Sequence, residues 1–173
     1  VSGPMLGSAQ ALAIYQNGMR VNESFGEVIQ WDLIPDFAIN NMQIFSGGDP
    51  IFGQNAIGGA ISMQMKNGFD NEGAKTTFSG GDHGRTNEVL EYGKAFGDYA
   101  VYLGANFNVD KGWRDQSESY LETFYSDFRY RGEDTELFLN IGQAFTDLRG
   151  NGAVPLTLIP LEGESAVYTH PDN

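Results

Sequence analysis

The second half of the chain contains long segments in which apolar residues occupy every second position. In residues 99–110, one set of alternate positions is apolar or aromatic and the other set is mostly small or polar. The apolar set is Tyr99, Val101, Leu103, Ala105, Phe107 and Val109. Because successive side chains of a β-strand point to opposite faces of its sheet, this spacing predicts a strand with one apolar face and one polar face.

Other segments of this half follow the same rule with interruptions. Between residues 136 and 145 the apolar positions are Leu137, Leu139, Ile141 and Phe145, and Gln143 interrupts them. Between residues 123 and 130 they are Phe124, Phe128 and Tyr130, interrupted by Ser126. Residues 74–79 and 86–96 give weaker strand signals. We therefore expect about five antiparallel strands in this half.

The connections between these strands alternate in length. Residues 97–98 and 132–134 are tight, Gly-containing turns, whereas residues 111–117 form a longer polar loop and a long irregular tail follows Phe145. Short turns at one end and long loops at the other are typical of an outer-membrane β-barrel. A soluble antiparallel sandwich also alternates, so periodicity alone leaves both folds open.

Composition excludes several classes of function. The chain carries a net charge of −13, which disfavours binding to nucleic acid. It has no cysteine, so disulfides, zinc–thiolate sites and iron–sulfur sites are excluded. Its two histidines, His83 and His170, are too few for a multi-histidine metal site, and His83 fits a turn. No apolar run reaches the length of about 18 residues that a membrane helix needs.

The first section of the chain has few charges and shorter elements. Residues 11–15 and 19–22 are predicted strands joined by Asn17-Gly18, a strong signal for a two-residue hairpin turn. A short helical stretch is expected from Ile34-Pro35, because proline is favoured at the first position of a helix. Residues 42–45 and 60–66 are the remaining predicted strands.

The order of motifs in this section resembles the C-terminal half of the plug domain of TonB-dependent outer-membrane receptors. That family has an aliphatic strand, an Arg-Gly-Pro turn, an aromatic-Gly pair, an Ala-x-Gly-Gly motif and a strand that ends in lysine. The corresponding residues here are Phe52-Gly53, Ala56-Ile57-Gly58-Gly59 and Lys66. Tyr15 to Asn22 and Leu33-Ile34-Pro35 resemble earlier elements of the plug, and residues 110–115 and 166–173 resemble barrel strands and loops of some members.

The resemblance implies a mainly β fold in two parts. Residues 1–68 would be a partial plug domain of mixed strands with a short helix, 69–72 a junction, and 73–173 about five antiparallel strands of an incomplete transmembrane β-barrel. Since family members close a barrel of about 22 strands, the sequence is expected to be a fragment of a larger receptor. The tight turns would lie on the periplasmic side, and residues 111–118 and the tail after Thr146 outside the cell.

The function that the resemblance implies is energised import across the bacterial outer membrane. The expected solute is scarce and large, by default a ferric siderophore, and the expected partners are outer-membrane lipid, that solute, and TonB through a segment outside this sequence. No enzymatic activity, catalytic residue, cofactor or resident metal is expected. A soluble carbohydrate-binding β-sandwich is the alternative. A glycosidase would need paired carboxylates, but Asp110, Asp115 and Glu118 lie in a polar loop typical of solvated charge.

Two sets of candidate site residues follow. Phe25, Gln30 and Trp31 combine aromatic surface with an amide, which suits a solute-binding apex of the plug. The competing interpretation is that Phe25 and Trp31 pack the core of the plug. The expected plug turn and lumen contacts are Gly47, Gly48, Phe52, Gly53, Gly58 and Gly59.

One departure from the family concerns the Arg-Gly-Pro turn. Ser46-Gly47-Gly48 stands in its place, and the turn is one residue shorter. The arginine that often pairs with barrel carboxylates in the family is therefore missing, and the resemblance does not predict locking of plug to barrel through that ion pair.

Overall fold

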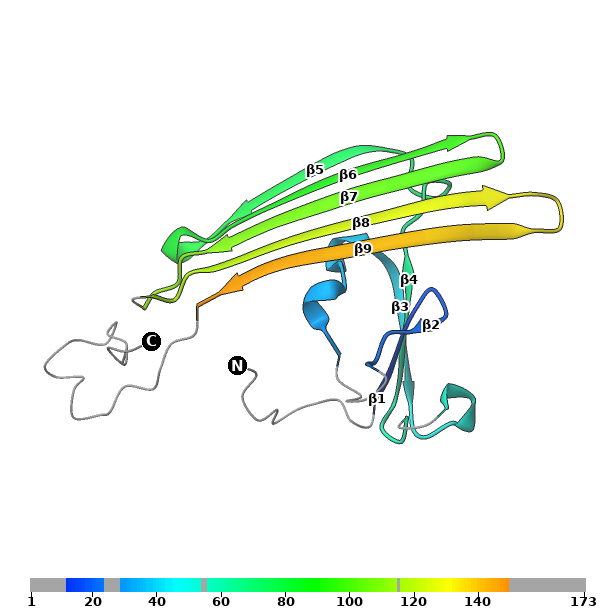
Figure 1. Ribbon diagram of the computed structural model, residues 1–173, viewed down its shortest axis with the longest axis horizontal. Coiled ribbons are helices and arrows are strands. Elements are labelled where there is room, and N and C mark those ends of the chain that lie inside the picture. Colours follow the sequence, from blue (N-terminus) through cyan, green and yellow to red (C-terminus); the bar gives the residue numbers. More distant parts are fainter. Residues whose placement is uncertain (1–11, 24–28, 54–55, 115, 150–173) are drawn as a thin grey trace, which may run out of the picture.

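The chain folds into two β-sheets, and the smaller sheet extends away from one face of the larger sheet (Figure 1). The computed structural model describes residues 12–23, 29–53, 56–114 and 116–149. One sheet has four strands in the order β2-β1-β4-β3, and the other has five in the order β5-β6-β7-β8-β9. Within the described residues, no helix is long and apolar enough to cross a membrane.

The four-stranded sheet is built around a hairpin. Strands β1 (Leu12–Gln16) and β2 (Met19–Arg20) are joined by Asn17-Gly18, and both turn residues have a positive φ, as the Asn-Gly signal predicts. Strand β4 (Gly59–Met65) pairs parallel to β1 and antiparallel to β3 (Ile39–Ser46).

Three single-turn 3-10 helices belong to this first part: η1 (Trp31–Leu33), η2 (Asp36–Ala38) and η3 (Pro50–Phe52). The helical stretch expected from Ile34-Pro35 is thus η2 alone, preceded by η1. Only three residues separate Pro35 from β3, which leaves no room for a longer helix.

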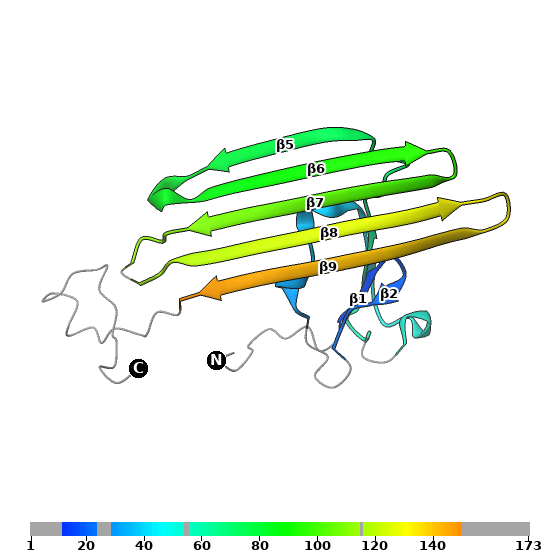
Figure 2. The same cartoon turned by 45° about the horizontal axis from the view of Figure 1, so that its top comes forward.

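The five-stranded sheet is antiparallel throughout, which confirms the predicted fold class. Its strands are β5 (Gly73–Gly80), β6 (Thr86–Phe96), β7 (Tyr99–Asp110), β8 (Ser119–Arg131) and β9 (Glu136–Leu148). Each pairs with the next along the chain, and the single turn η4 (Asp82–Gly84) joins β5 to β6. The tight turns β6–β7 and β8–β9 lie at the same end of the sheet (Figures 1 and 2).

We call this five-stranded sheet the wall. Its two faces differ in the chemistry of their side chains. Register places Val101, Phe128 and Leu139 in one row, and Leu103 and Ile141 lie in the next row on the same face. This apolar outer face is uncovered: Leu103 is 43% exposed and Leu139 58%. The four-stranded sheet lies on the opposite, inner face (Figure 2).

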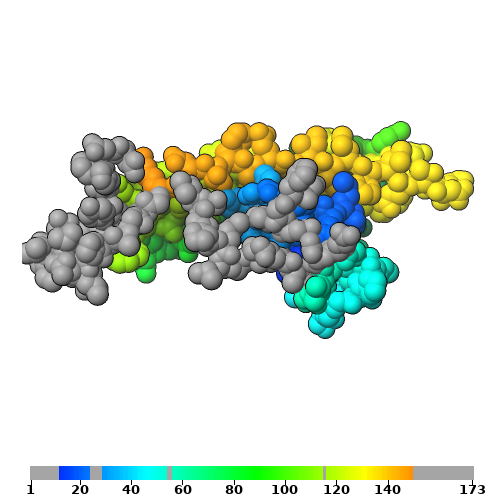
Figure 3. Space-filling view, turned by 60° about the horizontal axis from the view of Figure 1, so that its bottom comes forward, coloured from blue at the N-terminus to red at the C-terminus, as the bar shows by residue number. Residues whose placement is uncertain are grey.

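The inner face of the wall forms part of the buried core. Tyr102 and Tyr125 pack with Ile14, Met63 and Met65 of the four-stranded sheet. Asn106, Thr123 and Asp127 are also buried there. The wall therefore buries its polar face and exposes its apolar face, the reverse of a soluble sandwich. Figure 3 shows the hairpin β1–β2 (blue) beside β8 and β9 (yellow to orange), with the region of η3 (cyan) projecting away from the wall.

Gly59 offers a test of this packing. Its φ is +125°, and a Cβ there would overlap the carbonyl oxygen of Phe45 on β3. We expect Gly59→Ala to lower the free energy of unfolding by more than about 2 kcal/mol, measured by chemical denaturation. The control is Gly97→Ala: φ is +62° but no atom lies within 4 Å of the added Cβ, so the loss should be about 1 kcal/mol. Equal losses would contradict the crowding argument.

Candidate functional site: the interface between the two sheets

A charged contact joins the end of β4 to the wall. Lys66 follows β4 directly, and its ammonium pairs with the carboxylate of Glu91 on β6. The hydroxyl of Tyr102 donates to the same carboxylate at 2.8 Å, and Lys75 lies 3.4 Å from its other oxygen. The Glu91 side chain is only 9% exposed, so this set of donors compensates a carboxylate that is largely removed from water. We call these four residues the lysine contact.

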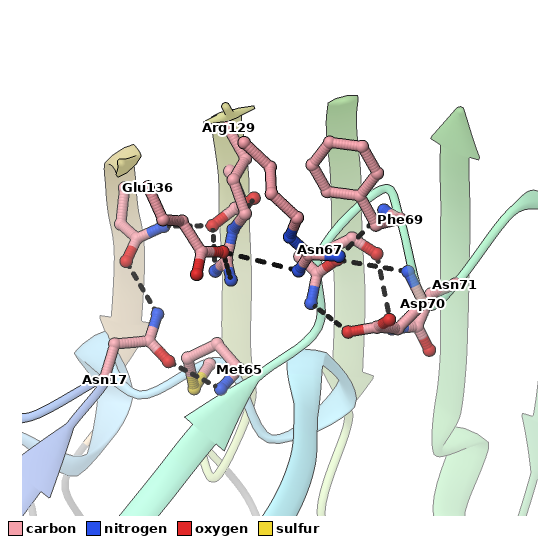
Figure 4. Close-up of polar contacts among 11 residues, drawn as sticks. Asn17, Met65, Asn67, Phe69, Asp70, Asn71, Arg129 and Glu136 are labelled. Atoms are coloured by element: carbon pink, nitrogen blue, oxygen red, sulfur yellow. Dashed lines mark hydrogen bonds and ion pairs between the residues drawn. The ribbon is translucent and has the colours of Figure 1, made fainter. Parts of the chain in front are cut away.

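A second polar contact starts at the hairpin turn. The Asn17 side chain donates to Asn140 on β9 at 2.7 Å, and Asn140 donates to Asp127 on β8 at 2.7 Å. Asp127 is fully buried and pairs with Arg129 at 3.0 Å. Asn17 also accepts from the backbone N–H of Met65 at 2.9 Å (Figure 4). We call Asn17, Asn140 and Asp127 the asparagine contact. It ties β1 and β4 to the wall.

The segment between the sheets packs closely on the wall. Asn67 is buried, and its side-chain oxygen accepts from the backbone N–H groups of Phe69 and Asp70 (Figure 4). A Cβ on Gly68 would overlap the backbone of Val101, and one on Gly93 would overlap the carbonyl of Asn71. This backbone-to-backbone packing fixes where the chain leaves the first sheet.

An aromatic contact supports the same segment. The guanidinium of Arg131, at the end of β8, lies 4.4 Å from the ring centre of Phe69. Arg131 and Arg129 both bind Glu136 on β9, at 3.3 and 3.1 Å. The end of the wall with the tight turns therefore contacts the linker, the segment between the two sheets, as well as the hairpin β1–β2.

Two of the three predicted apex residues are described by the structure, Gln30 and Trp31, at the start of η1. Trp31 is 56% exposed in η1 and is not among the core residues, so this structure does not support the competing interpretation that Trp31 packs in the core. Gln30 donates to Glu23 at 2.8 Å in an exposed position. Phe25 lies outside the described residues. The solute-binding role of the three residues stays a prediction.

The predicted turn and lumen contacts gather at the end of β3 and β4 that lies far from the wall (Figure 1). Phe52 packs on Phe45, with ring centres 5.0 Å apart, and accepts a hydrogen bond at its carbonyl from Tyr15 at 2.7 Å. Gly47, Gly53 and Gly59 have positive φ values, and Gly48 packs against the backbone of Ile57, next to Gly58. The structure uses these residues in the turns of the first sheet; their contact with a lumen stays a prediction.

Sequence reasoning missed both polar contacts. The resemblance drew attention to the absent turn arginine, whereas the ion pair to the wall comes from Lys66. The alternation of apolar and polar residues along the strands could have indicated them. Glu91 and Asp127 lie on the small or polar face of their strands, where a buried carboxylate needs a partner from another element. No group of three or more His, Asp or Glu side chains placed to hold a metal ion occurs among the described residues.

Comparison with known proteins defines the class of fold. No family model and no curated protein matches the sequence. Solved structures do match in fold, and two of them are a pyoverdine outer-membrane receptor and a siderophore receptor. The chain therefore has the fold of the plug and adjoining barrel strands of TonB-dependent receptors, as the motifs predicted.

The first match is the pyoverdine outer-membrane receptor FpvA of Pseudomonas aeruginosa, solved with pyoverdine bound. It has a TM-score of 0.60 and 11% identity over 81% of this chain and 22% of that one. The second is the siderophore receptor PiuA of Acinetobacter baumannii, with a TM-score of 0.62 and 18% identity over 86% and 20%. The chain thus spans about a fifth of the length of either receptor.

The lysine contact can be tested by a double-mutant cycle. Lys66→Met leaves a buried carboxylate with weaker compensation, so we expect it to lower the free energy of unfolding by about 3 kcal/mol. Adding Glu91→Leu should recover part of that loss, because the unpaired charge is removed. Lys94→Met is the control: its partner Glu72 is 3.8 Å away and both side chains are about half exposed, so the loss should stay below about 1 kcal/mol. Strict additivity of Lys66→Met and Glu91→Leu would contradict the coupling.

Proposed function

We propose that this chain is part of a TonB-dependent outer-membrane receptor that imports a large, scarce solute, a ferric siderophore. The carrying observation is the arrangement of the wall: its apolar face is bare, and its polar face holds the small sheet through the lysine and asparagine contacts. The two matched receptors are a pyoverdine receptor and a siderophore receptor, which supports this class of solute. Residues 1–68 are then the plug, 69–72 the junction and 73–173 the start of the barrel.

The outer face of the wall supports a position in the outer membrane. Phe96, Tyr99 and Tyr130 lie in one row near the tight turns, and Phe107, Phe124 and Phe145 cluster nearer the loops, with ring centres 5.8 and 6.4 Å apart. Along β7, Tyr99 and Phe107 are separated by about 26 Å at roughly 3.3 Å per residue. An apolar band bounded by aromatic rows, about 25 Å tall, is typical of a barrel surface in lipid.

Energy from the inner membrane would reach the plug through TonB. No covalent chemistry is required of the chain: solute binds at the apex and the outer loops, and the plug then rearranges within the wall. The partners are accordingly membrane lipid, the ferric siderophore, and TonB acting through a segment outside this sequence.

The test is radioiron uptake by a strain that lacks its own siderophore receptors and expresses the complete gene. We expect uptake from one of a panel of hydroxamate, catecholate and peptide siderophores, and loss of that uptake when TonB is deleted. Equal uptake with and without TonB, or no uptake from any member of the panel, would refute the proposal.

The apex hypothesis predicts a loss of binding without a loss of folding. Trp31→Ala should weaken binding of the imported ferric siderophore by at least about tenfold, as expected for an aromatic anchor. Because Trp31 is more than half exposed, the free energy of unfolding should change by less than about 1 kcal/mol. Leu33→Ala, in the same turn and 52% exposed, is the control that should leave binding unchanged. A destabilisation of about 3 kcal/mol at Trp31 would instead favour a core role.

If the apolar band faces lipid, the free-energy cost of a charged substitution should depend on its depth in the bilayer. Leu103→Arg lies between the two aromatic rows and should cost about 2–4 kcal/mol in a bilayer, whereas Val109→Arg, on the same face beyond the second row, should cost about 1 kcal/mol or less. Unfolding in lipid vesicles measures both. Similar costs at the two positions would argue against lipid contact on this face.

Sidedness gives a third prediction. The two positions Trp113 and Asp98 lie at opposite ends of the wall, in the loop after β7 and in the turn before it. An impermeant thiol reagent added to intact cells should label Trp113→Cys and leave Asp98→Cys unlabelled. The reverse pattern would place the tight turns outside the cell.

A further inference from the structure

Two buried side chains on the inner face of the wall each carry a polar atom that has no hydrogen-bond partner among the described residues. Asn106 on β7 and Thr123 on β8 are direct register partners, 6% and 4% exposed. Among the described residues, neither the amide oxygen of Asn106 nor the hydroxyl of Thr123 has a hydrogen-bond partner, and the same holds for the amide oxygen of Asn87 on β6. Such groups cost stability when buried, so each one calls for an explanation.

The place of this pair in the wall separates it from the polar contacts. On the inner face, Gly104 and Tyr125 form the next row toward the tight turns, with Glu91 beside Gly104 on β6. Asp127 and Asn140 follow one row further in the same direction. Both polar contacts therefore hold the plug on the turn side of Asn106 and Thr123.

Two single turns of the plug pack on the row next to the pair, the row of Gly104, Tyr125 and Gly142. Phe37 of η2 packs against Gly104, and the carbonyl of Leu33 in η1 lies 4.0 Å from a Cβ built on Gly142 of β9. No salt bridge joins η1 or η2 to the wall within the part of the chain that the structure describes. Of the two turns, η2 runs directly into β3, and the carbonyl of Ala38 accepts a hydrogen bond from the backbone N–H of Lys66 at 2.7 Å, so η2 is tied to the lysine contact. Within the described residues no hydrogen bond joins η1 to the wall, so η1 can shift while the lysine and asparagine contacts stay intact.

We propose that Asn106 and Thr123, together with Asn87, form a solute-binding strip on the wall that η1 covers at rest and uncovers during import. The amide oxygens accept hydrogen bonds and the hydroxyl does both, so the strip suits a solute whose surface presents N–H and O–H groups. This inference rests on the proposed function and adds the residues that contact the solute after it leaves the apex.

The first experiment measures whether the strip is uncovered. This chain has no cysteine, so Thr123→Cys in the complete receptor adds the only thiol of the segment. In cells given the imported ferric siderophore, an impermeant maleimide should label Thr123→Cys at least about tenfold faster when TonB is present than when it is deleted. Trp113→Cys should label in both strains and Ser126→Cys, on the outer face, in neither. Equal labelling of Thr123→Cys with and without TonB, or none in either strain, overturns the proposal.

The second experiment measures whether the polar groups matter. In Asn106→Leu/Thr123→Val the orphaned groups are removed, so Tm should stay constant or rise. Binding of the ferric siderophore should stay within about twofold, while the uptake rate falls about tenfold through loss of contacts made only in passage. Thr76→Val, on the outer face, is the control and should leave uptake unchanged. A lower Tm with normal uptake would assign the pair a structural role and overturn the proposal.

The two failures are distinguishable. If the unsubstituted receptor imports a ferric siderophore and Thr123→Cys is never labelled, the strip is wrong and the proposed function stands. If the unsubstituted receptor imports none, both fall.

Discussion

The compensation of buried charge on the inner face of the wall is the interaction on which the rest of the structure depends. A sheet that exposes its apolar face must bury its polar one, and a buried carboxylate is tolerated only with partners. Asp127 is fully buried and has Arg129 and Asn140; Glu91 has Lys66 and Tyr102. Because Asn17 and Lys66 adjoin strands of the small sheet, satisfying the buried charges of the wall also fixes the position of that sheet.

The sequence was most informative where physical constraints are local. Alternation in residues 99–110 predicted β7 and its two faces, and Asn17-Gly18 predicted the hairpin, because both depend on neighbours along the chain. The polar contacts could not be predicted in the same way. Asn17 and Asn140 are 123 positions apart, and their pairing depends on how two sheets dock. The expected helix after Ile34 became single turns, because the start of β3 at Ile39 limits its length.

The candidate site residues likewise divide into those that local sequence predicts and those that depend on how the sheets dock. The exposure of Trp31 agrees with an aromatic residue in a polar loop, and the glycines from Gly47 to Gly59 serve turns whose φ values suit glycine. Asn106 and Thr123 gave no sequence signal, since a polar residue on the small or polar face of a strand is expected. Their burial is visible only in the folded chain, and the absence of a hydrogen-bond partner among the described residues is what makes them unusual.

The linker between the sheets has an evolutionary consequence. At Gly68 and Gly93 the atoms that a side chain would meet are main-chain atoms, of Val101 and Asn71 respectively. Substitution of a neighbouring side chain cannot relieve such an overlap, because every amino acid carries the same backbone. Sequence drift in this region is therefore restricted in an unusual way: Phe69 and Arg131 can change together, whereas the two glycines have no compensating partner and must persist in any descendant that keeps this path of the chain.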